Sequence, residues 1–296
     1  MPGEFDFIEW VRARQKPSDF VPVPAGDDLA VLKWDAKDLL LVGTDQVLDG
    51  VHFNSSVHSP HDIGRKAMNR NLSDCAAMAC LPAAAVATVA LPKTRGMEYA
   101  KELYLGMKEA ADVFNCAIVG GDTGSWDGPL ALTVTVLGRT DGIEPVRRNG
   151  ARPGDGIYVS APLGGTILSK HLHFRPRIEL ARALARSGDA AAMIDLSDGL
   201  SRDLAHICRE SGVGAVIEAE RVPIGDDAVI LGLKDGRAPL EHALHDGEDY
   251  ELLFTCRGTP SLGIYIGRII SGWGVELETK DGRRTPLEPK GWEHTL

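Results

Sequence analysis

The sequence lacks the features that mark several common classes of protein. Positive charge is in deficit, with 32 Lys and Arg against 42 Asp and Glu in 296 residues and a formal net charge of −10. An acidic surface repels nucleic-acid backbones and anionic membranes, so neither is expected as a partner. The longest apolar run, Ala83–Leu91, is too short to span a bilayer, which takes about 20 residues. Because Met1–Trp10 is acidic and lacks the apolar segment of a signal peptide, we expect a cytoplasmic protein.

Cysteine is scarce and shows no CxxC pair. The five cysteines are Cys75, Cys80, Cys116, Cys208 and Cys256. An odd number of cysteines, several of them in apolar runs, predicts reduced and buried thiols. Hydrophobic residues make up 44% of the chain, which is enough for two cores at this length. A polar segment with Gly and Pro, Glu144–Asp155, predicts a boundary between residues 1–147 and a C-terminal α/β domain of residues 148–296.

Strand and helix patterns occur in both halves, which predicts the α/β (α+β) class. We expect strands at Leu39–Val42, Cys116–Val119, Leu130–Leu137, Gly156–Ser160, Ala192–Ile194, Val213–Ile217 and Glu251–Thr255. We expect helices at Pro60–Ala79, Met97–Phe114 and Ser197–Ser211. Pro60 suits a first helical turn, and Gly212 suits a helix end.

The usual nucleotide-binding motifs are absent. No GxxxxGKS or GxxxxGKT is present, and Gly164–Lys170 lacks the required Gly-Lys pair. No GxGxxG follows a strand, and no HRD or DFG marks a protein kinase. An ATP site in this chain must therefore have another design.

What the sequence does have is a recurring aspartate. Three expected strands run through small residues into Asp45, Asp122 and Asp195, and Asp198 follows shortly. Strand ends are where open sheets place ligand groups. For any single aspartate the alternative is a cap or turn, and Asp198 is placed to cap the helix that follows it.

Two further acidic positions strengthen the pattern. Asp28 belongs to the paired turn Gly26-Asp27-Asp28, and Asp74 lies in a helix among small apolar residues, where burial is costly without a positive partner. Carboxylates and hydroxyls are the ligands of Mg²⁺, which also takes phosphate oxygens. The pattern predicts a magnesium cluster that lets an acidic protein bind an acidic substrate.

Other polar residues give weaker indications. Lys66 and Arg70 share a helix face with Asp74, either as a solvated ion-pair face or as phosphate contacts. The histidine pairs His171/His173 and His242/His245 have no accompanying zinc motif, so a zinc site is not expected.

Eight segments occur in one order along nearly the whole chain. They are Gly26–Leu32, Thr44–Asp45 with Gly50–Phe53, Asn71–Met78, Gly120–Thr123, Asn149–Asp155, Ile194–Leu200, Gly247–Phe254 and Pro289–Trp292. In this order they resemble the thiamine-monophosphate kinase family, within the superfamily of aminoimidazole ribonucleotide synthetase. The resemblance implies transfer of the ATP γ-phosphoryl group to thiamine monophosphate. It also implies a homodimer, in which the N-terminal sheets form a shared barrel.

The resemblance further implies roles for matching positions. The implied magnesium ligands are Asp28, Thr44, Asp45, Asp74, Asp122, Asp195 and Asp198. The implied ATP contacts are Tyr104, Gly121, Asp122, Arg148 and Ser197. The implied thiamine phosphate contacts are His52, Glu248 and Trp292, and an aromatic ring suits a cationic thiazolium. Since the acceptor phosphate is already ionised, direct in-line transfer with several Mg²⁺ ions needs no covalent intermediate and no strong base.

Three departures from the family pattern stand out. Gly43 replaces a frequent hydroxyl residue, His245-Asp246 replaces a Gly-Gly pair, and the segment after Gly165 is short. The alternatives are another ATP-using synthetase of the superfamily and a nucleotide-binding regulatory module without turnover. The first Cys is Cys75 and the chain ends Trp292–Leu296, which disfavours the superfamily members that need an N-terminal or C-terminal Cys.

Overall fold

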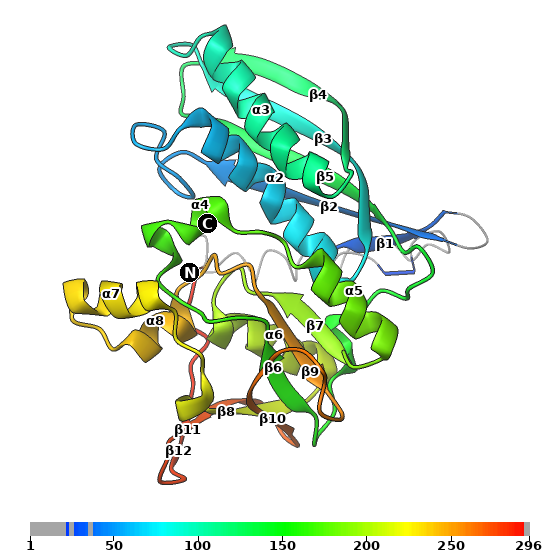
Figure 1. Cartoon of the computed structure of the whole chain (residues 1–296), viewed down its shortest axis with the longest axis vertical. Helices are drawn as coiled ribbons and strands as arrows, with labels where there is room; N and C mark the ends of the chain where they lie inside the picture. The colour runs from blue at the N-terminus through cyan, green and yellow to red at the C-terminus, as the bar shows by residue number, and fades with distance from the viewer. Residues whose placement is uncertain (1–21, 24–26, 35–37, 293–296) are drawn as a thin grey trace.

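The computed structural model describes residues 22, 23, 27–34 and 38–292, in which the chain forms two mixed sheets with helices packed around them (Figure 1). One sheet is built from the N-terminal half and the other from the C-terminal half, as expected for the α/β (α+β) class. Gly26 and the expected acidic N-terminus lie outside the described residues. The division between residues 147 and 148 stays a prediction.

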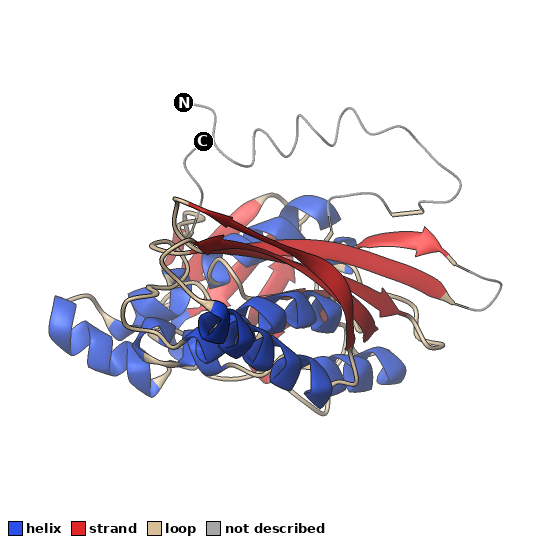
Figure 2. Ribbon diagram, turned by 90° about the horizontal axis from the view of Figure 1, so that it is seen from above, coloured by secondary structure: helices blue, strands red, loops and turns tan. Residues whose placement is uncertain are grey.

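The N-terminal sheet has five strands in the order β1-β2-β5-β3-β4. Their bounds are β1 (Ala30–Lys33), β2 (Leu39–Leu48), β3 (Leu81–Pro92), β4 (Ala117–Trp126) and β5 (Ala131–Arg139). Only β3 and β4 run parallel to each other. Helices α2 (Pro60–Ala77) and α3 (Met97–Val113) cover one face, and no helix of the described chain covers the other (Figure 2). The barrel expected from two such sheets stays a prediction, because the described residues of one chain form no closed barrel.

Strand β5 shows why one face is covered. Leu132, Val134 and Val136 are buried against the helices, while Thr133 and Thr135 between them are half-buried on the opposite face. Alternate side chains of a strand point to opposite faces, so the period-2 pattern fixes which face is apolar. The expected alternation is confirmed.

The C-terminal sheet has seven strands in the order β12-β11-β8-β10-β6-β9-β7. Their bounds are β6 (Gly156–Val159), β7 (Ala192–Asp195), β8 (Gly214–Glu218), β9 (Leu252–Cys256), β10 (Ile264–Ile270), β11 (Gly274–Glu278) and β12 (Arg284–Pro286). The helices of this half are α4 (Lys170–His173), α5 (Ile178–Ser187), α6 (Leu200–Ser211), α7 (Asp226–Asp235) and α8 (Pro239–His245). Short 3₁₀ turns are η1 (Arg148–Gly150), η2 (Thr166–Leu168) and η3 (Ala219–Arg221).

Helix α2 joins the two halves. Its start is fixed by Ser59, whose hydroxyl accepts a hydrogen bond from the Asp62 N–H at 3.1 Å, and by Pro60 in the first turn, as expected. It packs against α3 and the N-terminal sheet on one side and against α5 and β7 on the other. Ile178 and Leu184 of α5 belong to the same apolar core as the N-terminal sheet. Side chains on α2 can therefore act on both halves.

The prediction that Asp45 and Asp122 lie at strand ends is wrong. Asp45 lies inside β2, paired opposite Val134, because β5 continues the ladder beyond the apolar run. Asp122 lies inside β4, because the glycines before it continue the strand. A Cβ on Gly121 would stand 1.8 Å from the Ala87 carbonyl oxygen, so glycine lets the neighbouring strand approach. Asp195, the last residue of β7, does lie at a strand end.

Several elements were not expected from the sequence: the strands β1, β3, β10, β11 and β12 and the helices α4, α5, α7 and α8. Strand β3 contains the apolar run noted above, and α5 lies in a segment without an assigned element. Helix α6 begins three residues later than predicted and ends at Gly212, whose φ of +68° suits glycine. All five cysteines are buried and free, as expected. Within the described residues, the helices are all too short or too polar to cross a bilayer.

Candidate active site

A cavity of about 430 Å³ lies where β2 and α2 meet the loop after β7 and the start of α6. We call it the carboxylate cavity. Seven aspartates and three arginines contribute to its wall. The aspartates are Asp27, Asp28, Asp45, Asp74, Asp195, Asp198 and Asp203. The remaining predicted site residues on its wall are Thr44, His52, Arg148, Ser197 and Trp292.

Three of these aspartates converge from distant parts of the chain. Asp28 precedes β1, Asp74 lies on α2 and Asp195 ends β7, yet one carboxylate oxygen of each lies within 4.8 Å of the others. Burial and then the neighbouring carboxylates raise the pKa of Asp74 well above its ordinary value. Burial and the charge of Asp28 raise the pKa of Asp195 to about 8. Like charges forced together in this way favour a bound cation.

The protein's own cations meet only part of this charge. Arg148 holds Asp28, with its Nη2 and Nε atoms 2.9 Å and 3.0 Å from the two carboxylate oxygens. Arg70 Nε lies 3.3 Å from Asp45 Oδ2. The converging oxygen atoms at the centre fit Mg²⁺, a hard cation with oxygen ligands. The donor set therefore agrees with the ligand type that the sequence predicts.

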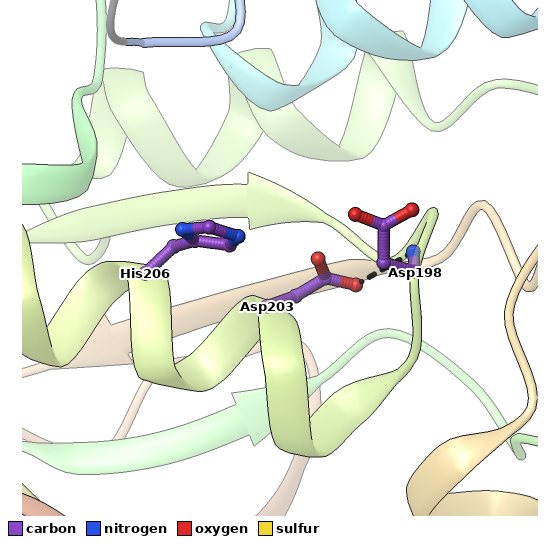
Figure 3. Close-up of side chains that lie close together, drawn as sticks. All are labelled: Asp198, Asp203 and His206. Carbon is purple, nitrogen blue, oxygen red and sulfur yellow. Dashed lines mark hydrogen bonds between the residues drawn. The ribbon is translucent and has the colours of Figure 1, made fainter. Parts of the chain in front are cut away.

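A second group of potential ligands lies at the start of α6 (Figure 3). Asp198, Asp203 and His206 each place one ligand atom within 4.8 Å of the others. The buried Asp203 accepts hydrogen bonds from the N–H groups of Asp198 and Gly199, both at 3.1 Å. Asp203 thus satisfies the N–H groups at the helix start, and its carboxylate fixes the backbone from which the Asp198 side chain projects (Figure 3).

The sequence reasoning missed Asp203 and His206. Both lie inside an expected helix, five and eight residues after Asp198. The available signal was helical spacing, which places Asp203 one turn after Gly199. The interpretation of Asp198 as a side-chain helix cap is wrong, since the cap residue is Gly199.

A second pocket, of about 250 Å³, adjoins the carboxylate cavity. We call it the aromatic pocket. The predicted substrate residues His52, Glu248 and Trp292 all lie on its wall. The rings of His52 and Trp292 are 6.3 Å apart between centroids, and Tyr250 stacks on Phe174 at 3.8 Å. The structure thus brings together the three residues predicted to contact one substrate.

The charge of Glu248 is fully matched by protein groups. Lys66 Nζ lies 2.6 Å from Glu248 Oε1, and His171 Nδ1 lies 3.5 Å from Oε2. Burial opposes ionisation, but His171, Lys66 and Arg70 outweigh it and lower the pKa of Glu248 to about 2. Glu248 is therefore ionised throughout the physiological range.

Three predicted residues lie elsewhere in this chain. Tyr104, Gly121 and Asp122 contribute to a separate hollow of about 450 Å³ between α3 and β4. In the sheet order, β4 is three strand spacings from β2, roughly 14 Å at about 4.8 Å each. Within one chain the structure does not bring Asp122 to Thr44 and Asp45.

The structure also shows where the lysine, arginine and histidine residues singled out in the sequence lie. The interpretation of Lys66 and Arg70 as a solvated face is wrong, since Lys66 is 0% exposed and Arg70 lines both cavities. The two groups of ligands described above contain neither histidine pair. Instead His171 lies 3.0 Å from Lys66 Nζ, and His242 lies 2.8 Å from Asp246.

Two departures from the family pattern have a structural basis. A Cβ on Gly43 would stand 2.3 Å from Cδ2 of the buried Leu29, so glycine here accommodates that leucine. Asp246 accepts a hydrogen bond from the Gly165 N–H at 3.1 Å, and His245 lies 2.9 Å from the Ser201 hydroxyl. The loop that replaces Gly-Gly is therefore anchored, and η2 and α4 occupy the short segment after Gly165.

The chain is similar to known proteins over nearly its whole length. Residues 26–140 match the family model of the AIR synthase related protein, N-terminal domain, and residues 152–256 match the C-terminal domain. The thiamine-monophosphate kinase of Rhodopirellula baltica is 45% identical, covering 98% of this chain and 97% of that relative. The thiamine-monophosphate kinase of Aquifex aeolicus is 33% identical, covering 99% and 98%.

A solved structure is also similar over nearly the whole chain. AaThiL complexed with AMPPCP and TMP aligns with a TM-score of 0.87 and 32% identity, covering 99% of this chain and 97% of that one. With two domain models and near full-length relatives in agreement, the chain belongs to the thiamine-monophosphate kinase family of AIR synthase related proteins.

Proposed function

We propose that this chain transfers the γ-phosphoryl group of ATP directly to thiamine monophosphate, giving thiamine diphosphate. Relatives that are 45% and 33% identical over nearly their whole length are thiamine-monophosphate kinases. The similar AaThiL structure holds AMPPCP, an ATP analogue, together with TMP. The same two substrates are proposed here.

The observation that carries the proposal is the shared wall of the two cavities. Arg70, Ser197 and Asp198 line both the carboxylate cavity and the aromatic pocket, as do His52, Tyr250 and Trp292. A phosphate held in one cavity and a ring system held in the other would therefore meet at this wall. Such an arrangement favours direct transfer between two bound substrates, because it aligns their phosphates before reaction.

The residues divide between the two substrates. Arg148 and Ser197 would bind ATP from the carboxylate cavity, with Tyr104, Gly121 and Asp122 completing its contacts. His52, Glu248 and Trp292 would hold thiamine monophosphate, and the ionised Glu248 beside an aromatic ring suits a cationic thiazolium. Arg70, at the shared wall, is placed to contact a phosphate.

The aspartates supply the metal site. Asp28, Asp74 and Asp195 form its centre, and Thr44, Asp45, Asp122 and Asp198 are the other proposed ligands. Bound Mg²⁺ ions supply charge neutralisation for the phosphates. The chain's own task is to hold both substrates in line and to exclude competing water. It provides no general base, because the acceptor phosphate oxygen is already ionised at neutral pH.

We also propose a homodimer through the N-terminal sheets. Strand β4 is a ten-residue edge strand with nearly every residue exposed, including Val119 at 63%. Long exposed edges are usually paired or covered in stable proteins. A second copy paired along this edge would also explain why Asp122 lies apart from Thr44 and Asp45, because each site would take Asp122 from the other copy.

One assay tests the activity. The purified chain is incubated with ATP, Mg²⁺ and thiamine monophosphate, and the expected product is thiamine diphosphate with one ADP per product. ATP binding without this product would contradict the proposal and favour a regulatory module. ATP hydrolysis without phosphorylation of thiamine monophosphate would favour another synthetase of the superfamily.

A mixing experiment tests the shared site. Asp45→Asn and Asp122→Asn are each expected to be inactive alone. Co-expressed in equal amounts, random pairing gives half heterodimers with one intact site in two, so about a quarter of wild-type activity should return. No recovery, with heterodimers present by mass spectrometry, would show that each chain builds its own site.

A further inference from the structure

Lys66 is a buried charge that the proposed chemistry does not use. It lies in the middle of α2, and its side chain is 0% exposed. Lysine is almost never fully buried unless it is paired, because its ammonium loses its hydration. Burial lowers the pKa of Lys66 to about 8, even though the charge of Glu248 opposes that effect. The contacts of its ammonium group show why it is retained.

Three acceptors surround the ammonium group. Nζ lies 2.5 Å from the main-chain oxygen of His52, 3.0 Å from Nδ1 of His171, and 2.6 Å and 2.8 Å from the carboxylate oxygens of Glu248. An ammonium group has three N–H donors, so each acceptor takes one. When Lys66 donates to Nδ1 of His171, the imidazole carries its own proton on Nε2.

The three acceptors come from different parts of the molecule. His52 follows β2 of the N-terminal half, whereas His171 lies on α4 and Glu248 in the loop before β9 of the C-terminal half. Two of them, His52 and Glu248, belong to the wall of the aromatic pocket, but Lys66 itself does not. Lys66 therefore contacts two residues of the pocket wall without lining the pocket itself.

Glu248 needs such support. Its φ of +65° lies in the left-handed region, which is unfavourable for a residue with a side chain. Its N–H donates to the Ser197 carbonyl oxygen at 2.7 Å, which holds the backbone, while Lys66 holds the carboxylate. Removing the ammonium would leave this carboxylate short of its closest positive partner.

We infer that Lys66 is a positioning residue that holds His52 and Glu248, one from each half of the chain, in the geometry that binds the thiamine phosphate. The inference rests on the proposed function, which assigns those two residues to that substrate. Lys66 acts through them and touches neither substrate. Its loss should therefore weaken binding of thiamine monophosphate and leave binding of ATP unchanged.

The test is a steady-state comparison of wild type with Lys66→Met, which keeps the length of the side chain and removes the charge. The KM for thiamine monophosphate should rise about tenfold or more, as when one partner of a buried ion pair is removed. The KM for ATP should stay within about twofold. Lys280→Met, the same change on the exposed turn between β11 and β12, is the matched control and should leave both constants unchanged.

A double-mutant cycle separates positioning from general destabilisation. In a Glu248→Gln background, Lys66→Met should raise the KM for thiamine monophosphate by a clearly smaller factor than in wild type, because one of the two partners it acts through is changed. Additive effects would overturn the inference, as would a single variant that changes both KM values equally. Should Lys66→Met fail to fold, Lys66→Gln, which keeps an N–H donor without the charge, is measured against the same expectations.

The outcomes also separate this inference from the proposed function. Absence of thiamine diphosphate with the wild-type chain would remove the proposed function itself. An active wild type with an unchanged KM for thiamine monophosphate in a folded Lys66→Met would overturn only the positioning role.

Discussion

The carboxylate cavity and the aromatic pocket share a wall, but they treat buried negative charge in opposite ways. In the carboxylate cavity, seven aspartates meet three arginines, and the pKa of Asp195 is raised to about 8 by burial and Asp28. In the aromatic pocket, Lys66, His171 and Arg70 overcome burial and lower the pKa of Glu248 to about 2. One region leaves its charge unmatched, and the other matches it with the protein's own cations.

The difference indicates what each region binds. A carboxylate already paired by the protein stays ionised without a metal ion. Carboxylates crowded together without enough cations are stabilised when metal ions enter. A chain of net charge −10 can therefore bind two phosphate compounds if metal ions neutralise charge in the carboxylate cavity alone.

The strongest way to break this comparison is to remove charge from the carboxylate cavity. Asp74→Asn or Asp45→Asn should lower turnover at least about 100-fold, because metal-bound charge stabilisation is worth several kcal/mol. The fold should persist, since asparagine fits the same space and removes a repelled charge. Turnover by steady-state assay and the thermal midpoint check both statements. Asp281→Asn, the same change on an exposed turn, should be neutral. Near wild-type turnover in either variant would remove that residue from the metal site.

The second largest effect should come from removing the ion pair between Lys66 and Glu248 at the aromatic pocket. Glu248→Gln removes the negative partner of Lys66, so the KM for thiamine monophosphate should rise about tenfold. The KM for ATP should not change, because ATP is bound from the other cavity. Kinetics with each substrate varied in turn measure this difference. A rise in the KM for ATP alone would reverse the assignment of the two cavities.

Metal addition should distinguish the two regions without any turnover. Saturating Mg²⁺ should raise the thermal midpoint of the chelator-treated protein by about 5 °C or more, because the ions bind only the folded carboxylate cavity. Differential scanning calorimetry measures the shift. Asp74→Asn should reduce the shift, and Glu248→Gln should keep it. An equal shift in wild type and Asp74→Asn would place the metal elsewhere.

The smallest expected effect concerns Asp249, a buried carboxylate that lines neither cavity. Burial raises the pKa of Asp249 from 3.8 to about 7, although Lys170 and the Gly164 N–H oppose it. The folded state then binds more protons than the unfolded state between these values, so this group contributes stability at low pH that is lost as pH rises towards 7. Between pH 5 and pH 8 the free energy of unfolding of Asp249→Asn should therefore rise relative to that of wild type by on the order of 2–3 kcal/mol. Urea unfolding of both proteins with chelator present checks it, and parallel pH curves would contradict the expected role of Asp249.

Local patterns in the sequence predicted the elements that depend on neighbours along the chain. The alternation in β5, Pro60 at the start of α2 and Gly212 at the end of α6 each follow from backbone geometry and a one-sided apolar face. Strand lengths were less predictable, because β2 extends past Asp45 only through pairing with β5. Strand β3 and helix α5 were missed, and both are stabilised by packing against distant elements.

The candidate site shows the same division. The sequence by itself determined which residue types are present, and the order of its segments determined the family to which they belong. Only the tertiary structure decided that Asp28, Asp74 and Asp195 converge, that Asp122 lies apart from them, and that Lys66 is buried behind Glu248 instead of exposed. The physical reason is that charge compensation depends on distance and burial in space, and helix α2 sets both by packing between two halves that are far apart in sequence.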